Sequence, residues 1–157
     1  IAVHIHPESI VHSMVEYVDG ALIAQLGIPD MKTPIAYALT YPERLALDLP
    51  ALDLCRLSQL NFAVPDSQCF PCLGLAYAAI RRGGTTPAVL NAANELAVDA
   101  FLQEKISFLD IPRIIGKVVA KHTNTAASSL ELILDADRWA RQATQNVIHE
   151  IQGVSYA

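Results

Sequence analysis

Three histidines near the start of the sequence are the first residues whose types and spacing could do chemistry. His4 and His6 are two residues apart, so on a strand they would share one face, and His12 follows in the stretch "HIHPESIVHSM". Imidazoles can bind zinc or iron, but no motif here supplies a further ligand. An exposed or hydrogen-bonded role is the better interpretation of His4. For His6 and His12 a functional role stays open, because His6 precedes a proline at a strand end, where sites are often built.

Two further patterns could hold a ligand. Met31 stands on a stiff stretch between Pro29 and Pro34, where it could pack against a flat ligand or fill a core. Both interpretations stay open. Asn91 and Glu95, in "NAANE", are one helical turn apart and could contact a polar ligand. We favour a structural role for this pair, in which hydrogen bonds fix the helix to a neighbouring loop, because the alanines between them indicate close helix packing.

The spacing of Cys69 and Cys72 is that of a C-x-x-C motif. A structural zinc site would need two more ligands at matching distances, and a redox pair would need a thioredoxin-like context. Neither is present, so we interpret the two thiols as an incidental, half-buried pair.

The elements that must position these residues begin with a β-rich stretch. Residues 1 to 5 are strand-like, 9 to 17 are rich in β-branched residues, Asp19-Gly20 predicts a hairpin turn, and 21 to 27 return. Prolines then end the ladder, and "TPIAYALTY" predicts a short helix with Thr33 as its N-cap. Residues 42 to 70 contain scattered prolines and predict an irregular connection.

From Pro71 the apolar period changes from two to 3.6, which predicts four helices. They cover "PCLGLAYAAIRR", ending at Gly83-Gly84; "TPAVLNAANELAVDAFLQEK", capped by Thr86; "DIPRIIGKVVAKH", capped by Asp110; and "DADRWARQATQNVIHEIQ". The residues predicted to face a core are Leu90, Ala93, Ala97, Phe101, Ile111, Ile114, Ile115 and Val118. We therefore predict an α+β chain with three parts: a strand and hairpin with a short helix in 1–41, a connecting segment in 42–70, and a four-helix bundle in 71–157.

Composition narrows the class of function. Of the 157 residues 52% are hydrophobic and 17% charged, and the net charge is −5 with 11 scattered basic residues, which argues against nucleic-acid binding. No apolar run approaches the roughly 18 residues of a membrane span, and no signal peptide is evident. Three cysteines fit a reducing compartment, so we expect a cytoplasmic protein. Because the chain starts at Ile1 inside an alternating run, we expect an upstream portion to be missing.

Four stretches, in order along the chain, carry a family resemblance: "HPESIVHSMVEYVDGALIAQLGIPDMKTPIAYAL", "LDLCRLSQLNFAVPD", "FPCLGLA" and "LNAANELAVDAFL". They resemble the 1-deoxy-D-xylulose 5-phosphate reductoisomerases of the non-mevalonate isoprenoid pathway. The resemblance implies an NADPH domain, a catalytic domain and a helical bundle. This chain would hold the end of the catalytic domain, the connection and the bundle. The resemblance implies NADPH and Mg2+, Mn2+ or Co2+ as cofactors and a small phosphorylated sugar as substrate. It also implies a homodimer. The upstream domains would hold the metal and phosphate ligands, with no metal ligand in this chain.

The resemblance also assigns roles to individual residues. Ser9 matches a serine at a strand end near substrate and nicotinamide, and His12 matches a histidine expected to be needed for catalysis. Pro29 and Met31 match the loop that packs beside the nicotinamide ring. Glu8 stands where many family members have glutamine, so its role stays open.

Three hypotheses follow from the sequence. The first is the C-terminal portion of such a reductoisomerase, which we expect to be inactive alone. The second is a binding or oligomerisation module that uses the helical bundle and the hairpin edge. The third is a small histidine-based metalloenzyme.

Overall fold

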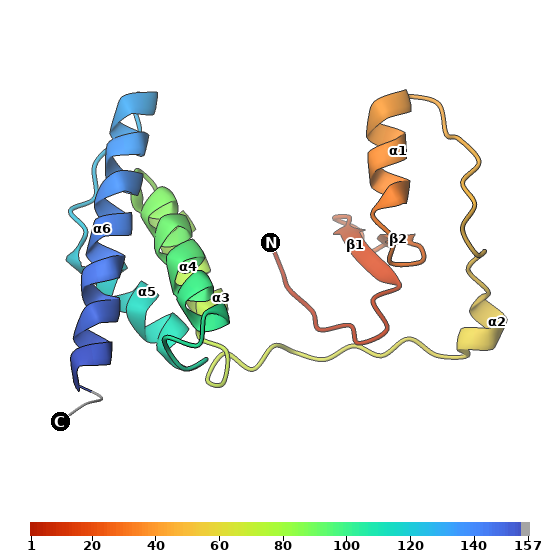
Figure 1. The fold of residues 1–157 in the computed structure, drawn as a ribbon. Helices are drawn as coiled ribbons and strands as arrows, with labels where there is room; N and C mark the ends of the chain where they lie inside the picture. Colours follow the sequence, from red (N-terminus) through yellow and green to blue (C-terminus); the bar gives the residue numbers. More distant parts are fainter. Residues whose placement is uncertain (155–157) are drawn as a thin grey trace. The chain divides into compact units, whose positions relative to one another are not determined.

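The computed structural model describes residues 1 to 154, and residues 155–157 of the predicted bundle lie outside them. The chain forms two compact units. The first comprises Ile1–Pro65, and the second begins at Asp66. The first holds the strands β1 (Val11–Glu16) and β2 (Leu22–Leu26) and the helices α1 (Lys32–Thr40) and α2 (Leu54–Leu57) (Figure 1). The second holds α3 (Cys72–Arg82), α4 (Thr86–Leu102), α5 (Asp110–Lys121) and α6 (Leu130–Val154). The predicted α+β class, a hairpin followed by a four-helix bundle, is confirmed.

The hairpin turn forms where Asp19-Gly20 predicts it. Gly20 has a positive φ of 83°, which a glycine adopts without steric cost, and the Asp19 carboxylate accepts a hydrogen bond from the amide of Ala21. The predicted strand over residues 1 to 5 is wrong in extent, because only Ile5 pairs, in an isolated bridge with Ala63. The irregular stretch predicted for 42 to 70 also contains α2, whose first amides bond to the Asp53 carboxylate.

The helical unit is built around α4, which packs against α3, α5 and α6 (Figure 1). Its small buried residues Ala93 and Ala97 let the helices approach closely, and the buried isoleucines of α5 belong to the same core. Burying each branched aliphatic side chain contributes roughly 1.5–3 kcal/mol. The predicted core positions are confirmed. Leu90 and Phe101 are the partly buried members, packed at the margin of this core.

Four predicted helix starts are wrong by one to five residues. In α1 the Asp30 carboxylate accepts from the amide of Lys32, so the helix begins before Thr33. In α4 the N-cap is Thr85, not Thr86. Asp110 lies inside α5, where its carboxylate accepts from the amide and hydroxyl of Ser107. In α6 the Ser129 hydroxyl accepts from the amide of Leu132, so the helix begins well before Asp135.

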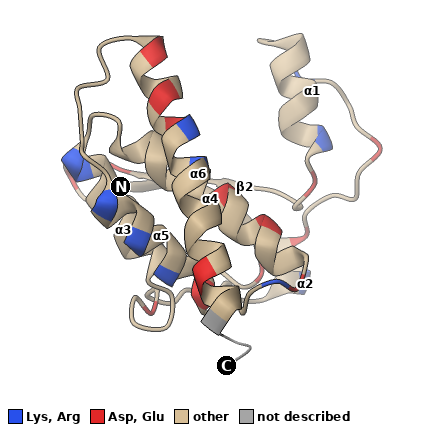
Figure 2. Cartoon of the chain, turned by 60° about the vertical axis from the view of Figure 1, so that its left-hand side comes forward, with Lys and Arg blue, Asp and Glu red and all other residues tan. Residues whose placement is uncertain are grey.

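Charges of both signs lie on the surface of the helical unit. Arg113, Lys117 and Lys121 recur every four residues on the exposed face of α5, while acidic residues stand in the first turns of α6 (Figure 2). Three basic side chains in a row are typical of a solvated helix face rather than of a nucleic-acid groove. In the described part of the chain, no helix is both long and apolar enough to cross a bilayer.

Hydrogen bonds of Thr85 fix the α3–α4 turn to the segment after α5. Thr85 is fully buried, and its hydroxyl lies 2.8 Å from Nε2 of His122. The backbone amide of Thr85 donates to the carbonyl of Thr125 and to the side-chain oxygen of Asn124. Gly84, with φ 58°, leaves no room for a Cβ beside the carbonyl of Thr125. The His122 ring also packs on Trp139, with 5.2 Å between centroids. Burial, with a smaller contribution from Arg82, lowers the pKa of His122.

This lowered pKa predicts acid sensitivity of the helical unit. The ordinary pKa is 6.5, so the unfolded chain binds a proton at a higher pH than the folded one. The contribution of His122 to the free energy of unfolding is therefore complete above about pH 6.5 and decreases as the pH falls toward the folded pKa. Urea unfolding at several pH values between 7.5 and 5.5 measures it. His122→Gln, which keeps a polar side chain but does not titrate, should flatten this dependence, and an unchanged slope would contradict the prediction.

Candidate functional site

The hairpin of the first unit carries His12 at an irregular position. Val11 pairs with Leu26, and Ser13 pairs with Gln25, so His12 is an extra residue of β1 in a β-bulge. A bulge bends the strand and turns a side chain away from the regular alternation. His12 lines two hollows of this unit. The irregular pairing thus places His12 between two concave surfaces.

The larger hollow, of about 900 Å³, lies at the end of β2 and the start of α1. His12, Pro29 and Met31, three of the four predicted site residues, line it together. Met31 is 70% exposed, so it does not belong to the buried core of the described residues. The remaining lining residues are Gln25, Leu26, Gly27, Ile28, Asp30, Thr33, Pro34, Tyr37 and Arg44. An exposed, flexible thioether between rigid prolines suits contact with a flat ligand.

Arg44 and Tyr37 belong to this hollow and were missed by the sequence reasoning. The guanidinium carbon of Arg44 lies 4.3 Å from the centre of the Tyr37 ring, a cation–π contact. Arg44 lies in the segment interpreted only as a connection. No sequence signal links it to Tyr37, because the contact depends on how the chain turns back after α1.

Ser9, the fourth predicted site residue, lines neither hollow. It sits in the turn before β1, where its amide donates to the carbonyl of His6 at 3.1 Å. Its φ of 51° is left-handed, which costs a non-glycine residue roughly 1–2 kcal/mol. The surrounding contacts must therefore hold this turn in place.

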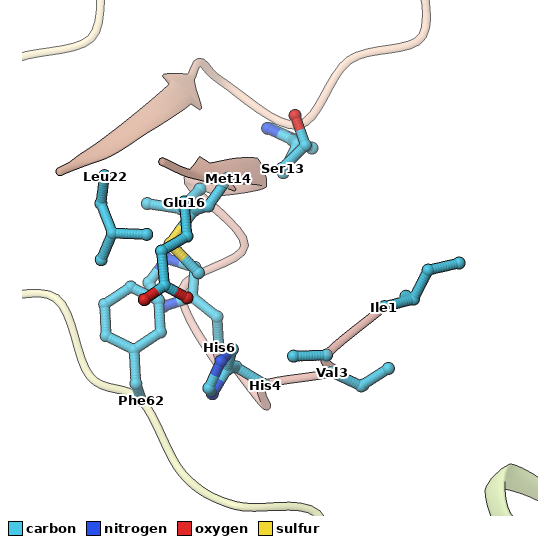
Figure 3. Close-up of a pocket in the computed structure, with 12 residues that line it drawn as sticks. Ile1, Val3, His4, His6, Ser13, Met14, Glu16, Leu22 and Phe62 are labelled. Carbon is cyan, nitrogen blue, oxygen red and sulfur yellow. The ribbon is translucent and has the colours of Figure 1, made fainter. Parts of the chain in front are cut away.

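The smaller hollow, of about 540 Å³, is also lined by His12, and Figure 3 shows several of its other lining residues. Figure 3 shows Leu22, Glu16 and Phe62 together on one side and Ile1 and Val3 on the other. The histidines His4 and His6 line it as well. Within residues 1 to 154 no group of three possible ligand side chains could hold a metal ion, so these histidines give the metalloenzyme hypothesis no support.

Glu8 and His6 make the polar contacts next to the smaller hollow. Glu8 accepts from the amide of Asn61 at 3.2 Å and from its side-chain Nδ2, and it lies 3.1 Å from Nδ1 of His6. These contacts, the Asn61 side chain first, lower the pKa of Glu8. Nothing in the sequence pattern indicates the pairing, because the partners are more than fifty residues apart.

The two thiols of the C-x-x-C pair are free and differ in surroundings. Cys69 is exposed and Cys72 half-buried against the helical core. A hydrogen bond to Asp66 raises the pKa of Cys69, and burial raises that of Cys72. Raised pKa values keep both thiols protonated at neutral pH, which makes them poor nucleophiles and metal ligands.

Asn91 and Glu95 take part in a structural network on the helical unit. Asn91 donates to Glu95 at 2.9 Å, and Arg141 of α6 donates to Glu95 at 2.7 Å and to Asp137 at 2.8 Å. Arg141 and then Asn91 lower the pKa of Glu95. The favoured structural role fits these contacts, but the partner is a neighbouring helix rather than the expected loop.

The fold and its hollows define the class: an α+β protein with a hairpin unit that bears a concave surface, followed by a four-helix unit. A family model described as the DXP reductoisomerase C-terminal domain matches residues 26–143. This chain belongs to that family.

Relatives of known structure and sequence agree with this assignment. The 1-deoxy-D-xylulose 5-phosphate reductoisomerase of Desulfosudis oleivorans is 62% identical over 142 residues, which cover 90% of this chain and 37% of that protein. The structure of the reductoisomerase from Zymomonas mobilis in complex with NADPH superposes with a TM-score of 0.86 at 46% identity, over 94% of this chain and 39% of that one. A DOX-P reductoisomerase structure with NADPH, fosmidomycin and magnesium gives a TM-score of 0.82 at 45% identity, over 95% of this chain and 39% of that one. The chain thus spans about two fifths of the length of these relatives.

The Arg141 network predicts a measurable difference between two arginines of α6. Arg141 bridges two helices, whereas the ion pair of Arg138 within residues 1 to 154 is with Asp135 on its own helix. Arg141→Gln should lower the free energy of unfolding by about 1 kcal/mol, the upper end for an exposed pair, and Arg138→Gln by about 0.3 kcal/mol. Chemical denaturation of both variants measures this. Equal effects would show that Arg141 does not hold α6 against α4.

Proposed function

We propose that this chain is the C-terminal part of an NADPH-dependent reductoisomerase that converts 1-deoxy-D-xylulose 5-phosphate to 2-C-methyl-D-erythritol 4-phosphate. Family membership supports the proposal, and so do the NADPH and magnesium complexes of its structural relatives. The observation that carries it is the hollow that Pro29, Met31 and His12 share. The chain supplies one wall of the active site in the cytoplasm, and upstream domains supply the rest.

The larger hollow fits the nicotinamide end of the cofactor. Its surface combines the stiff apolar pair Pro29 and Met31 with a few polar groups, as cofactor sites do. When bound there, NADPH supplies the hydride of the reduction. Pro29 and Met31 hold the ring and exclude water from it. Ser9 and His12 are the polar groups that approach substrate and cofactor from the strand end.

The metal ion of the reaction is held elsewhere in the proposed enzyme. The described residues contain no group of three His, Cys, Asp or Glu side chains that could hold it. We assign the Mg2+, Mn2+ or Co2+ ligands and the sugar-phosphate contacts to upstream domains. Residues 1 to 41 then serve as the cofactor-side wall.

A homodimer completes the proposal. Val15 and Ile23, which pair across the hairpin, are 57% and 62% exposed, and a two-stranded sheet leaves both outer edges with unpaired backbone groups. Such an edge readily pairs with another strand. The hairpin is thus suited to extend a sheet shared by two subunits.

A hybrid enzyme tests the proposed function directly. In it, this chain replaces the matching portion of the Desulfosudis oleivorans relative. We expect the hybrid to oxidise NADPH with 1-deoxy-D-xylulose 5-phosphate and Mg2+ or Mn2+, and the chain alone to be inactive. The parent enzyme is the positive control, and circular dichroism establishes that the hybrid folds. A folded hybrid without turnover would contradict the proposal and favour a helical binding module.

Within the hybrid, Ser9→Ala and Met31→Ala should each lower kcat/KM by about tenfold, because Met31 lines the larger hollow and the Ser9 hydroxyl is proposed to approach substrate and cofactor from the strand end. Both positions are exposed, so the free energy of unfolding should change by about 0.5 kcal/mol or less. Ser13→Ala and Met14→Ala are matched controls, since these residues line only the smaller hollow. Steady-state kinetics and thermal melts measure both quantities. Parallel losses of rate and stability would return Ser9 and Met31 to a structural role.

A further inference from the structure

A polar cluster links the start of the hairpin unit to a segment far along the chain. Ile5 and Ala63 exchange two backbone hydrogen bonds of 2.9 Å. Glu8 accepts from both the backbone and the side chain of Asn61. The ring of His6 stacks on Phe62, with 4.5 Å between centroids and 12° between planes. These contacts lie directly before the left-handed Ser9.

The hydrogen bonds of His6 fix its ionisable ring. Nδ1 lies 2.7 Å from the carbonyl of Asn61 and 3.1 Å from the Glu8 carboxylate. Both neighbours only accept, so Nδ1 carries a proton and, in the neutral ring, Nε2 is an acceptor. The side chain is 7% exposed, and Nε2 has no hydrogen-bond partner among the described residues. Because Nδ1 is held by the Asn61 carbonyl and the Glu8 carboxylate, the His6 ring has a fixed orientation.

Little else in this unit can hold the turn at Ser9. Ile10 is its one buried residue in the described structure, at 5% exposed. The carbonyl of Ile10 accepts from the amide of Gly27, next to the loop of Pro29 and Met31. The backbone from Glu8 to Ile10, which precedes the ladder that starts at Val11, therefore depends mainly on the hydrogen bonds of the cluster and on this single apolar anchor.

We propose that Glu8, His6 and Asn61 form a positioning clasp that sets the backbone at Ser9 and thereby the placement of Ser9 and His12. Its catalytic consequence rests on the proposed function. Its structural consequence does not. The three residues act through Ser9 and His12 and touch neither substrate nor cofactor.

The variants Glu8→Gln and Glu8→Ala distinguish a loss of the clasp's hydrogen bonds from a general loss of stability. In Glu8→Gln the amide oxygen can still accept from the Asn61 amide and from His6, and its NH2 can donate to Oδ1 of Asn61 once that side-chain amide flips. Glu8→Ala removes every one of these bonds. Asn61→Asp places a second carboxylate against Glu8, and the double variant Glu8→Gln with Asn61→Asp restores a donor facing an acceptor.

Nuclear magnetic resonance of this chain tests the clasp without reference to activity. In the unsubstituted chain and in Glu8→Gln, nitrogen shifts of His6 should report the Nδ1–H form, and the Ser9 amide should exchange slowly with solvent. In Glu8→Ala and Asn61→Asp the Ser9 amide should exchange at least about tenfold faster. The double variant should recover slow exchange. Unchanged exchange in Glu8→Ala would overturn the proposal.

The hybrid enzyme tests the catalytic consequence. Glu8→Ala and Asn61→Asp should lower kcat by about tenfold or more with smaller changes in KM, whereas Glu8→Gln and the double variant should stay within about threefold of the unsubstituted hybrid. Equal loss in Glu8→Gln and Glu8→Ala would overturn the positioning role. An inactive unsubstituted hybrid would instead contradict the proposed function, and the resonance measurements would still decide whether the clasp exists.

Discussion

The antiparallel pairing of β1 with β2 is the constraint on which the candidate site depends. Its register brings the residues before β1 next to the loop after β2, since Val11 faces Leu26 and Ile10 bonds to Gly27. A shift by one residue would turn every side chain of one strand to the other face. The bulge at His12 departs from this pattern at one position only. The bulge therefore changes the direction of the His12 side chain and leaves the pairing from Ser13 to Glu16 regular.

The two units are stabilised in different ways. The helical unit has a continuous aliphatic core in which α4 contributes small residues and α5 larger ones. The hairpin unit has almost no buried apolar surface and relies on hydrogen bonds and ring stacking, with the contacts between residues 5–8 and 61–63 closing it. A unit held mainly by polar contacts is sensitive to single substitutions at those contacts, because each hydrogen bond is a large share of the total.

Features set by neighbouring residues were predictable from the sequence. The turn at Gly20, the four helices of the bundle and the buried isoleucines of α5 follow from local conformational preference and period. The helix caps were less accessible, since Thr85 uses its hydroxyl for His122 rather than for its own helix. The bulge at His12 was out of reach because it depends on how β2 pairs. The Glu8 contacts joined residues that no sequence pattern connects.

The same distinction applies to the candidate site. The stiff loop with Pro29 and Met31 is visible in the sequence, and the family resemblance gave it a role. Its neighbours Tyr37 and Arg44 emerge only when α1 turns the chain back over the hollow. Sequence reasoning thus found the residues on one element and missed those brought in by the return of the chain.

The most direct test of the account uses the two methionines of this chain as reporters. Met31 lines the larger hollow and Met14 the smaller one, so methyl-labelling only this segment of the hybrid enzyme gives two signals at separate places. We expect NADPH to shift the Met31 methyl signal and to produce a nuclear Overhauser effect from the nicotinamide protons, while the Met14 signal stays unchanged. Binding of NADPH that leaves the Met31 signal unmoved would contradict the claim that this chain forms the wall beside the nicotinamide.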